Sequence, residues 1–393
     1  MSHLLEPITL GGSIPLRNRV CMGALTRNRC IDNSKPTEAT VRYYAERAQD
    51  GVGLIIVEGT MISPHGVEWP HVPMLFDESH VEAWKQVTDA VHRHGGKIFF
   101  QPWHAGRIQN DNMPMLKDSG YLVLAPSAIK ARGGKYRTLP GLPGHTENFV
   151  EIEDHGMILE QYRHSVKLAK EAGFDGVELL AQGGYLLHSY LCSHSNQRKD
   201  HYGGSVENRC RFPLEVLDAI INEWGPGAVG IKICPTDDYN DSMVSFRELS
   251  ETYDYLICQL VSRDLGYINI SRRGCDLGRS QDESWTPSPR PKGYELPEGY
   301  DPVKHFGPLI KFPGSKTMLM ANHEYTVEEA NQLVKDGQLD IVTFGRPFIH
   351  NPDVISRIRN GIPFAGNDRG GFVNYGPYKC PDENYNDWPH ATI

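Results

Sequence analysis

Residues 156–180 read GMILEQYRHSVKLAKEAGFDGVELL and contain the unit on which the fold depends. Apolar residues recur at helical spacing over Gly156–Ala172, and Gly176–Leu180 is a short apolar run of strand length. Helical segments and apolar runs of the same kind alternate over the rest of the chain. This alternation is typical of βα units arranged around a parallel sheet.

Eight of the apolar runs are predicted to be strands. They are Arg19–Met22, Leu54–Glu58, Lys97–Gln101, Gly176–Leu180, Val229–Cys234, Tyr267–Ile270, Thr317–Met320 and Ile341–Phe344. Amphipathic helices are predicted at Glu38–Gln49, Val81–His94, Gly156–Ala172, Glu207–Glu223, Phe246–Arg263 and Val327–Asp336. Eight strands with long connections favour an α/β fold of the (β/α)8 TIM-barrel type, with residues 1–393 as a single domain. An open Rossmann sheet is disfavoured because no GxGxxG motif follows an early strand.

Three further segments are assigned places on this barrel. Ile8–Leu16 alternates around Gly11-Gly12 and is predicted to form a hairpin that plugs the barrel bottom. Gly106–Asn148 and Arg272–Val303 are long, rich in Gly, Pro and charge, and follow the third and sixth strands. They are therefore expected to be long loops over the C-terminal face that shape access to a site. The aromatic-rich tail after Ile362 is expected to pack across the barrel mouth.

Composition limits the classes of partner. The net charge of −9 argues against nucleic acid and anionic membranes, since these select basic surfaces. No apolar stretch approaches the roughly 20 residues needed to span a bilayer, and the N-terminus lacks a signal-peptide pattern. The eight cysteines form no CxxC pair and no zinc-ligand spacing, so reduced thiols and no metal are expected. We expect a cytoplasmic protein, as a monomer or homodimer, that acts on a small molecule.

A phosphate-binding site is predicted where the last two strands end. Strand seven ends at Met320-Ala321-Asn322, and strand eight is followed by Gly345-Arg346-Pro347. Barrel enzymes often bind a phosphate with these two loops and a helix N-terminus. Gly345 allows close approach of the backbone, and Arg346 offers a bidentate cationic group.

Several segments together are similar to blocks of the old yellow enzyme family, in the family order, from about Glu6 to Pro389. The segments that carry this resemblance are Ala24–Arg27, Val57–Gly59 with Ile62–Pro64, Gln101 with Trp103, His194–Asn196 with the following residues to Arg209, and Phe344–Asp353. The resemblance implies a barrel with non-covalently bound FMN and NAD(P)H as co-substrate. It places Ala24, Leu25, Thr26, Gly59, Gln101, Lys232, Ala321, Asn322, Gly345 and Arg346 around the cofactor.

Individual roles follow from the same resemblance. Thr26 is expected to bond the flavin carbonyl beside the reactive nitrogen, and Gln101 to hold the pyrimidine edge. Lys232 stands where the family usually has arginine, near the other pyrimidine carbonyl. A lysine there keeps the charge that stabilises anionic reduced flavin but loses the planar guanidinium.

The substrate side departs from the family pattern. Between Glu178 and Tyr185 the family has a His and an Asn that hydrogen-bond the substrate carbonyl, and these positions are Leu180 and Gly183 here. Losing one such donor typically raises a barrier by about 3–4 kcal/mol. Tyr185 aligns with the family tyrosine that protonates the substrate α-carbon. The substrate pocket is expected to be lined by Leu180, Gly183, Trp103, His104 and Tyr385.

Three explanations of the missing pair stay open. Another donor has replaced it, for which the nearest candidates are Gln182, His104, His323, Tyr385 and His188. Alternatively the substrate needs less carbonyl activation, or the flavin reaction differs. The leading hypothesis is NAD(P)H-dependent reduction of an activated C=C bond. The alternatives are an isomerase or dehydrogenase of secondary metabolism and a non-catalytic flavin-binding scaffold.

Overall fold

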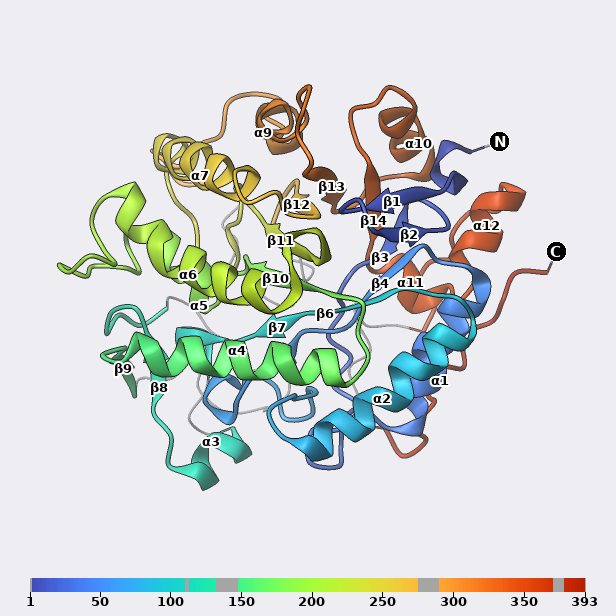
Figure 1. Cartoon of the computed structure of the whole chain (residues 1–393), viewed down its shortest axis with the longest axis horizontal. Helices are drawn as coiled ribbons and strands as arrows, with labels where there is room; N and C mark the ends of the chain where they lie inside the picture. Colours follow the sequence, from blue (N-terminus) through green and yellow to red (C-terminus); the bar gives the residue numbers. More distant parts are fainter. Residues whose placement is uncertain (1, 110–112, 132–147, 275–289, 370–377, 393) are drawn as a thin grey trace.

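The computed structural model describes residues 2–109, 113–131, 148–274, 290–369 and 378–392. Eight parallel strands close into a barrel, in the order β10-β11-β12-β13-β14-β3-β4-β6, with helices around it (Figure 1). The strands are β3 (Val20–Met22), β4 (Leu54–Ile56), β6 (Ile98–Phe100), β10 (Gly176–Ala181), β11 (Val229–Ile233), β12 (Tyr267–Ser271), β13 (Met318–Asn322) and β14 (Ile341–Phe344). All eight lie at the predicted places, so the TIM-barrel prediction is confirmed.

The predicted hairpin plugs the barrel. β1 (Ile8–Leu10) pairs antiparallel with β2 (Ile14–Leu16), and Leu10 and Leu16 pack with the inward side chains of the strands, such as Phe99. The turn at Gly11, with a φ of +53°, lies against the backbone of Gly227, which precedes β11. The hairpin therefore seals the N-terminal end of the barrel, opposite the end where substrates bind in this fold.

Six helices agree with the prediction to within three residues at either end. They are α1 (Glu38–Asp50), α2 (Glu78–Arg93), α4 (His155–Glu171), α6 (Val206–Trp224), α7 (Phe246–Val261) and α10 (Val327–Lys335). Five helices of the described residues lie outside the six predicted segments, namely α3 (Pro114–Ser119), α5 (Leu186–Leu191), α9 (Pro302–Ile310), α11 (Pro347–His350) and α12 (Val354–Asn360). In α9 two prolines obscure the helical pattern, but Pro302 occupies the first turn, where a proline is tolerated, and Asp301 caps the helix. None of the helices in the described residues is both long and apolar enough to cross a membrane.

The long loop after β6 is partly structured and covers the C-terminal end of the barrel. β7 (Pro102–Trp103) pairs with β5 (Thr60–Met61), and β8 (Val123–Ala125) pairs with β9 (Phe149–Glu151). Apolar side chains of these segments form a cluster, which we call the mouth cluster, that contains Met61, Trp69, Met74, Trp103 and Val123. Residues 110–112 and 132–147 of this predicted loop, and residues 275–289 of the second, lie outside the described residues.

The C-terminal tail packs on the β3 side of the molecule. Tyr385 is fully buried and stacks on Tyr43 of α1, with 4.3 Å between ring centroids. The guanidinium of Arg27 lies over the Tyr385 ring and donates a hydrogen bond to the Asn384 carbonyl. The tail thus holds the segment that follows β3, while residues 370–377 lie outside the described part of the chain.

Candidate active site

The inward-facing side chains become polar toward the C-terminal ends of the strands. Glu178 of β10 is fully buried, and its Oε1 accepts a hydrogen bond from the Gln101 amide at 2.8 Å. Its Oε2 accepts from the Tyr267 hydroxyl at 3.0 Å and from the Asn269 amide at 3.1 Å. This network crosses the barrel interior and fixes Gln101 at the floor of the mouth.

Lys232 of β11 lies beside this network. It is only 7% exposed, and its register partners are Leu180 on β10 and Asn269 on β12. Its ammonium makes no hydrogen bond or ion pair with any residue that the structure describes. Burying an ammonium without a counter-charge is costly, so this position calls for an anionic or strongly accepting group above it.

A second group of cations surrounds the ends of β12, β13 and β14. Burial, together with the nearby cations Arg346, Arg273, Lys232 and Arg272, lowers the pKa of His323 to about 3. Two acidic residues pair with these cations. Glu324 has an oxygen 3.7 Å from Arg346 and an ion pair to Arg273, and Glu329 pairs with Arg272 at 2.7 Å. This part of the mouth is strongly positive, as expected of a phosphate site.

The backbone of this region also suits an anion. His323 and Glu324 have φ values of +86° and +56°, a left-handed conformation that non-glycine residues seldom adopt. Asn322 Oδ1 and Thr343 Oγ1 are buried and make no hydrogen bond with described residues. These polar atoms and the adjacent cations line the predicted phosphate loops.

The segment after β3 borders the same site. Ala24, Leu25 and Thr26 are all half-buried, and the Gly23 N–H donates to the Phe344 carbonyl at 2.9 Å. A Cβ at Gly345 would lie 3.5 Å from the Leu25 side chain, so the loops after β3 and β14 touch. Ala321 was expected to contact the cofactor. Its side chain instead packs in the hydrophobic core between the barrel and the helices.

Tyr185 begins α5 directly after β10 and is half-buried. Its ring meets the Trp103 ring edge-on, with 4.8 Å between centroids and an interplanar angle of 72°. Leu180 and Tyr185 both pack on the mouth cluster. Gly59 makes room for the indole, because a Cβ there would lie 2.6 Å from Trp103 Cε3. The predicted acid and two predicted pocket residues are therefore neighbours.

The turn before Tyr185 is held by Asp237 and Asn240, which the sequence did not reveal, and by His188, which was predicted only as a candidate donor. Gly183 has a φ of +75°, its N–H donates to Asp237 Oδ2 at 2.6 Å, and its carbonyl accepts from the Asn240 amide at 2.7 Å. The Gly184 N–H donates to His188 Nδ1 at 3.0 Å. Burial raises the pKa of Asp237 to about 7 and lowers that of His188 to about 3.

Gln182 lies at the end of β10, on the same side of the strand as Glu178 and Leu180. Its Oε1 accepts a hydrogen bond from the Ser271 hydroxyl at 2.7 Å, across the end of β11. Its amide N–H groups make no hydrogen bond with described residues. The side chain is half-buried. An oriented amide donor is thus available over the barrel mouth.

The other four candidate donors are placed differently. His188 accepts from Gly184 through Nδ1, and its Nε2 lies 3.3 Å from the Tyr253 hydroxyl. The His104 ring packs against Gly66, and its Nδ1 accepts from the Gly106 N–H at 3.1 Å. His323 lies among the cations after β13, and Tyr385 stacks on α1.

A family model described as the NADH:flavin oxidoreductase / NADH oxidase family matches residues 3–364. The chain belongs to this family. It is 34% identical over 391 residues to a probable flavin mononucleotide-dependent alkene reductase of Leishmania infantum, with 98% of this chain and 97% of that protein covered.

Two solved structures of related proteins show the same barrel. The old yellow enzyme homologue of Zymomonas mobilis has a TM-score of 0.84 at 30% identity, covering 99% of both chains. Morphinone reductase in complex with tetrahydroNAD has a TM-score of 0.82 at 33% identity, covering 100% of this chain and 98% of that one. The protein is thus an FMN-dependent oxidoreductase with the old yellow enzyme fold.

The family's cofactor fits the residues at the barrel mouth. The unpaired Lys232 ammonium and the Gln101 amide would hold the pyrimidine edge of FMN, and Thr26 would lie beside the ring. Arg346 and the polar atoms after β13 and β14 would hold the phosphate. Three or more His, Cys, Asp or Glu side chains do not gather into a metal site within the described residues.

Two substitutions should distinguish the residues that bind the flavin ring from those that bind the phosphate of FMN. Arg346→Ala should weaken binding of FMN to the apoprotein by roughly tenfold to a hundredfold, since a charge-assisted pair is lost, and leave riboflavin binding unchanged. Lys232→Met should weaken both by a similar factor, because the ammonium would bind the ring that FMN and riboflavin share. Flavin fluorescence titration measures each dissociation constant. Arg247→Ala, at an arginine that is 86% exposed on α7, is the control, and equal losses for FMN and riboflavin in Arg346→Ala would contradict the assignment.

Proposed function

We propose that this enzyme uses NADH or NADPH to reduce an activated C=C bond of a small molecule, with Tyr185 as proton donor and Gln182 as the group that binds the substrate carbonyl. The proposal rests on three groups that lie at the same barrel mouth. These are the unpaired cation Lys232, the phenol of Tyr185 and the free amide donor of Gln182. When bound and reduced, FMN supplies the hydride for the β-carbon.

Tyr185 is suited to the proton transfer. A phenol can act as a general acid that donates its proton once negative charge develops on the α-carbon. Trp103 packs edge-on against its ring, and the Gly183-Gly184 turn places Tyr185 at the start of α5. Asp237, Asn240 and His188 act as positioning residues, because they bind the backbone of that turn.

Gln182 is suited to the carbonyl. The Ser271 hydroxyl occupies its oxygen, so the amide nitrogen is directed away from β12 and both N–H groups remain for a ligand. Lys232 on the intervening strand adds positive potential where the substrate oxygen gains charge. One neutral donor stabilises that charge less than a histidine and an asparagine together, which favours substrates with a strongly polarised double bond.

The alternative reaction is isomerisation or dehydrogenation of a secondary metabolite, with Tyr185 as acid or base. The apolar side chains of Leu180 and Trp103 beside Tyr185 suit a reaction with weak carbonyl activation. This alternative reaction would use the same cofactor site. An isomerase, unlike the reductase, would need no external electron donor, and this difference can be tested.

Anaerobic stopped-flow spectroscopy tests the proposal. We expect NADPH or NADH to bleach the flavin absorbance, and a nitroalkene or a polarised dienone to restore it, with one C=C bond reduced per flavin. Redox-neutral turnover of the same compounds without pyridine nucleotide would instead establish the isomerase. Failure of both nucleotides to reduce the flavin would overturn the reductase proposal.

We also propose the wider setting of this activity. The whole chain, residues 1–393, would act as one FMN-binding domain in the cytoplasm, as a monomer or homodimer. The net charge of −9 supports a small-molecule partner over nucleic acid or an anionic membrane surface.

A further inference from the structure

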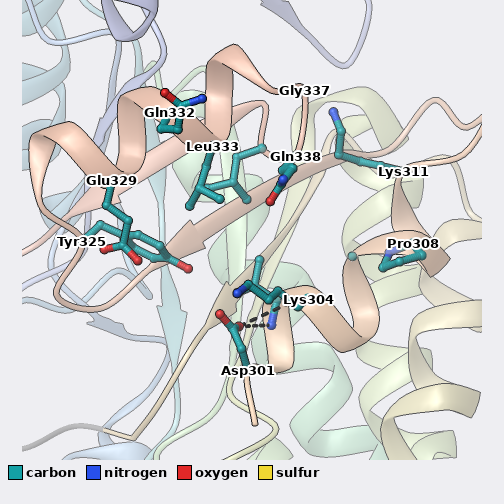
Figure 2. A pocket seen from close by; sticks show the side chains of 13 residues that line it. Asp301, Lys304, Pro308, Lys311, Tyr325, Glu329, Gln332, Leu333, Gly337 and Gln338 are labelled. Atoms are coloured by element: carbon teal, nitrogen blue, oxygen red, sulfur yellow. Dashed lines mark hydrogen bonds between the residues drawn. The ribbon is translucent and has the colours of Figure 1, made fainter. Parts of the chain in front are cut away.

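A cavity of about 740 Å³ lies on the outside of the barrel between α9 and α10, remote from the barrel axis (Figure 2). We call it the α9–α10 cavity. Val303 of α9, Leu333 of α10 and Leu339, which precedes β14, provide apolar walls. Its volume lies in the range of cavities that hold small organic ligands. None of its lining residues takes part in the reaction proposed above.

Tyr325 is the polar group that points to a ligand. It is 6% exposed, and its hydroxyl is directed from the β13–α10 connection into the cavity (Figure 2). This hydroxyl makes no hydrogen bond with any described residue. The Arg272 guanidinium lies over the other part of the ring, 4.0 Å from its centroid. A phenol whose O–H faces the cavity and has no protein acceptor is available to donate a hydrogen bond to a ligand.

The charged side chains that line the α9–α10 cavity indicate which kind of ligand can accept the hydrogen bond of Tyr325. Glu329 is paired with Arg272 at 2.7 Å, and Lys311 with Asp340 at 2.5 Å. Asp301 accepts from the Val303 N–H at 2.8 Å and from the Lys304 N–H at 3.3 Å at the positive end of α9. Burial, followed by the charge of Asp301, raises the pKa of the Tyr325 hydroxyl. The ammonium of Lys304 is exposed and has no partner among the described residues. The unused groups are therefore a cation and a phenol donor beside apolar walls.

We infer that the α9–α10 cavity is a second ligand site, for an amphipathic carboxylate whose anionic end is bound by Lys304 and Tyr325 and whose apolar body lies against Leu333 and Leu339. The site adjoins the cofactor region through Arg272, which also donates to the His323 carbonyl at 2.8 Å. Its ligand lies outside the barrel and leaves the substrate face of the flavin free.

Isothermal titration of the FMN-loaded enzyme with decanoate, at low ionic strength and below micelle formation, tests the inference. We expect saturable 1:1 binding that leaves the flavin spectrum unchanged and is not displaced by cyclohexenone. Tyr325→Phe keeps the ring on Arg272 and should weaken binding roughly tenfold, since a hydrogen bond to a charged group is lost. Lys304→Glu should weaken it at least as much, because attraction becomes repulsion.

Two controls make the result decisive. Lys85→Glu, which reverses an exposed lysine on α2, should leave decanoate binding unchanged. Decyltrimethylammonium has the same body with the opposite charge and should bind much more weakly. Equal binding of this cation, binding that shifts the flavin spectrum and competes with cyclohexenone, or unchanged affinity in both cavity variants would overturn the inference.

Discussion

Tyr185→Phe should slow the oxidative half-reaction, in which the reduced enzyme reacts with an alkene, by about 10²–10⁴-fold. Flavin reduction by NAD(P)H should stay within about twofold of the wild-type rate, because no proton is delivered to an alkene in that step. The phenylalanine keeps the edge contact with Trp103, so the pocket retains its shape. Stopped-flow traces of the reductive and oxidative half-reactions, recorded separately, measure the effect of the substitution on each rate.

The reductive half-reaction is the internal control for this variant. An equal slowing of both halves would show that Tyr185 shapes the pocket for nicotinamide and alkene alike and donates no proton. Unchanged rates in both would assign the proton to solvent or to another residue.

Gln182→Leu should lower kcat/KM for an activated enone by about 10²–10³-fold, the loss typical of one oxyanion donor. It should also weaken binding of para-substituted phenols over the flavin, whose oxygen would lose the same amide. Leucine retains the bulk of the side chain, so FMN content should not change. Enone turnover, and flavin difference spectra with a phenol, provide the two measurements.

Two further variants test the role of the amide. Ser271→Ala removes the hydroxyl that orients the Gln182 oxygen and should produce a smaller loss, of roughly tenfold, with the amide still present. Gln86→Leu, on the exposed side of α2, controls for expression and stability. Full activity in Gln182→Leu would remove Gln182 from the proposal and leave the carbonyl to another donor.

The structure also explains why the family pair cannot simply be restored. Gly183 has a left-handed φ of +75°, and a Cβ there would lie 2.7 Å from Cε2 of Tyr185. Asparagine tolerates this backbone better than most residues, but its Cβ would displace the tyrosine ring. Leu180→His alone is therefore the better test of whether a histidine at this position strengthens binding of the substrate carbonyl.

The sequence by itself determined the barrel and the cofactor, and it predicted Tyr185 as the acid. Each strand and most helices are encoded by local periodicity, so alternating apolar runs placed all eight strands, and α9 was missed where prolines interrupt its pattern. The FMN-side residues stand in short segments that follow those strands. Because strand ends meet at one face in this fold, their order along the chain was enough to bring them together.

Only the tertiary structure decided what surrounds the acid and which donors are unpaired. Gln182 is oriented by Ser271, and the turn before Tyr185 by Asp237 and Asn240, all from other strands or loops. The resemblance predicted Lys232 near the flavin, whereas no sequence pattern singled out Tyr325. The structure adds that each side chain is buried and makes no hydrogen bond with the described residues. Hydrogen bonding and burial depend on neighbours that are distant along the chain, so no local pattern records them.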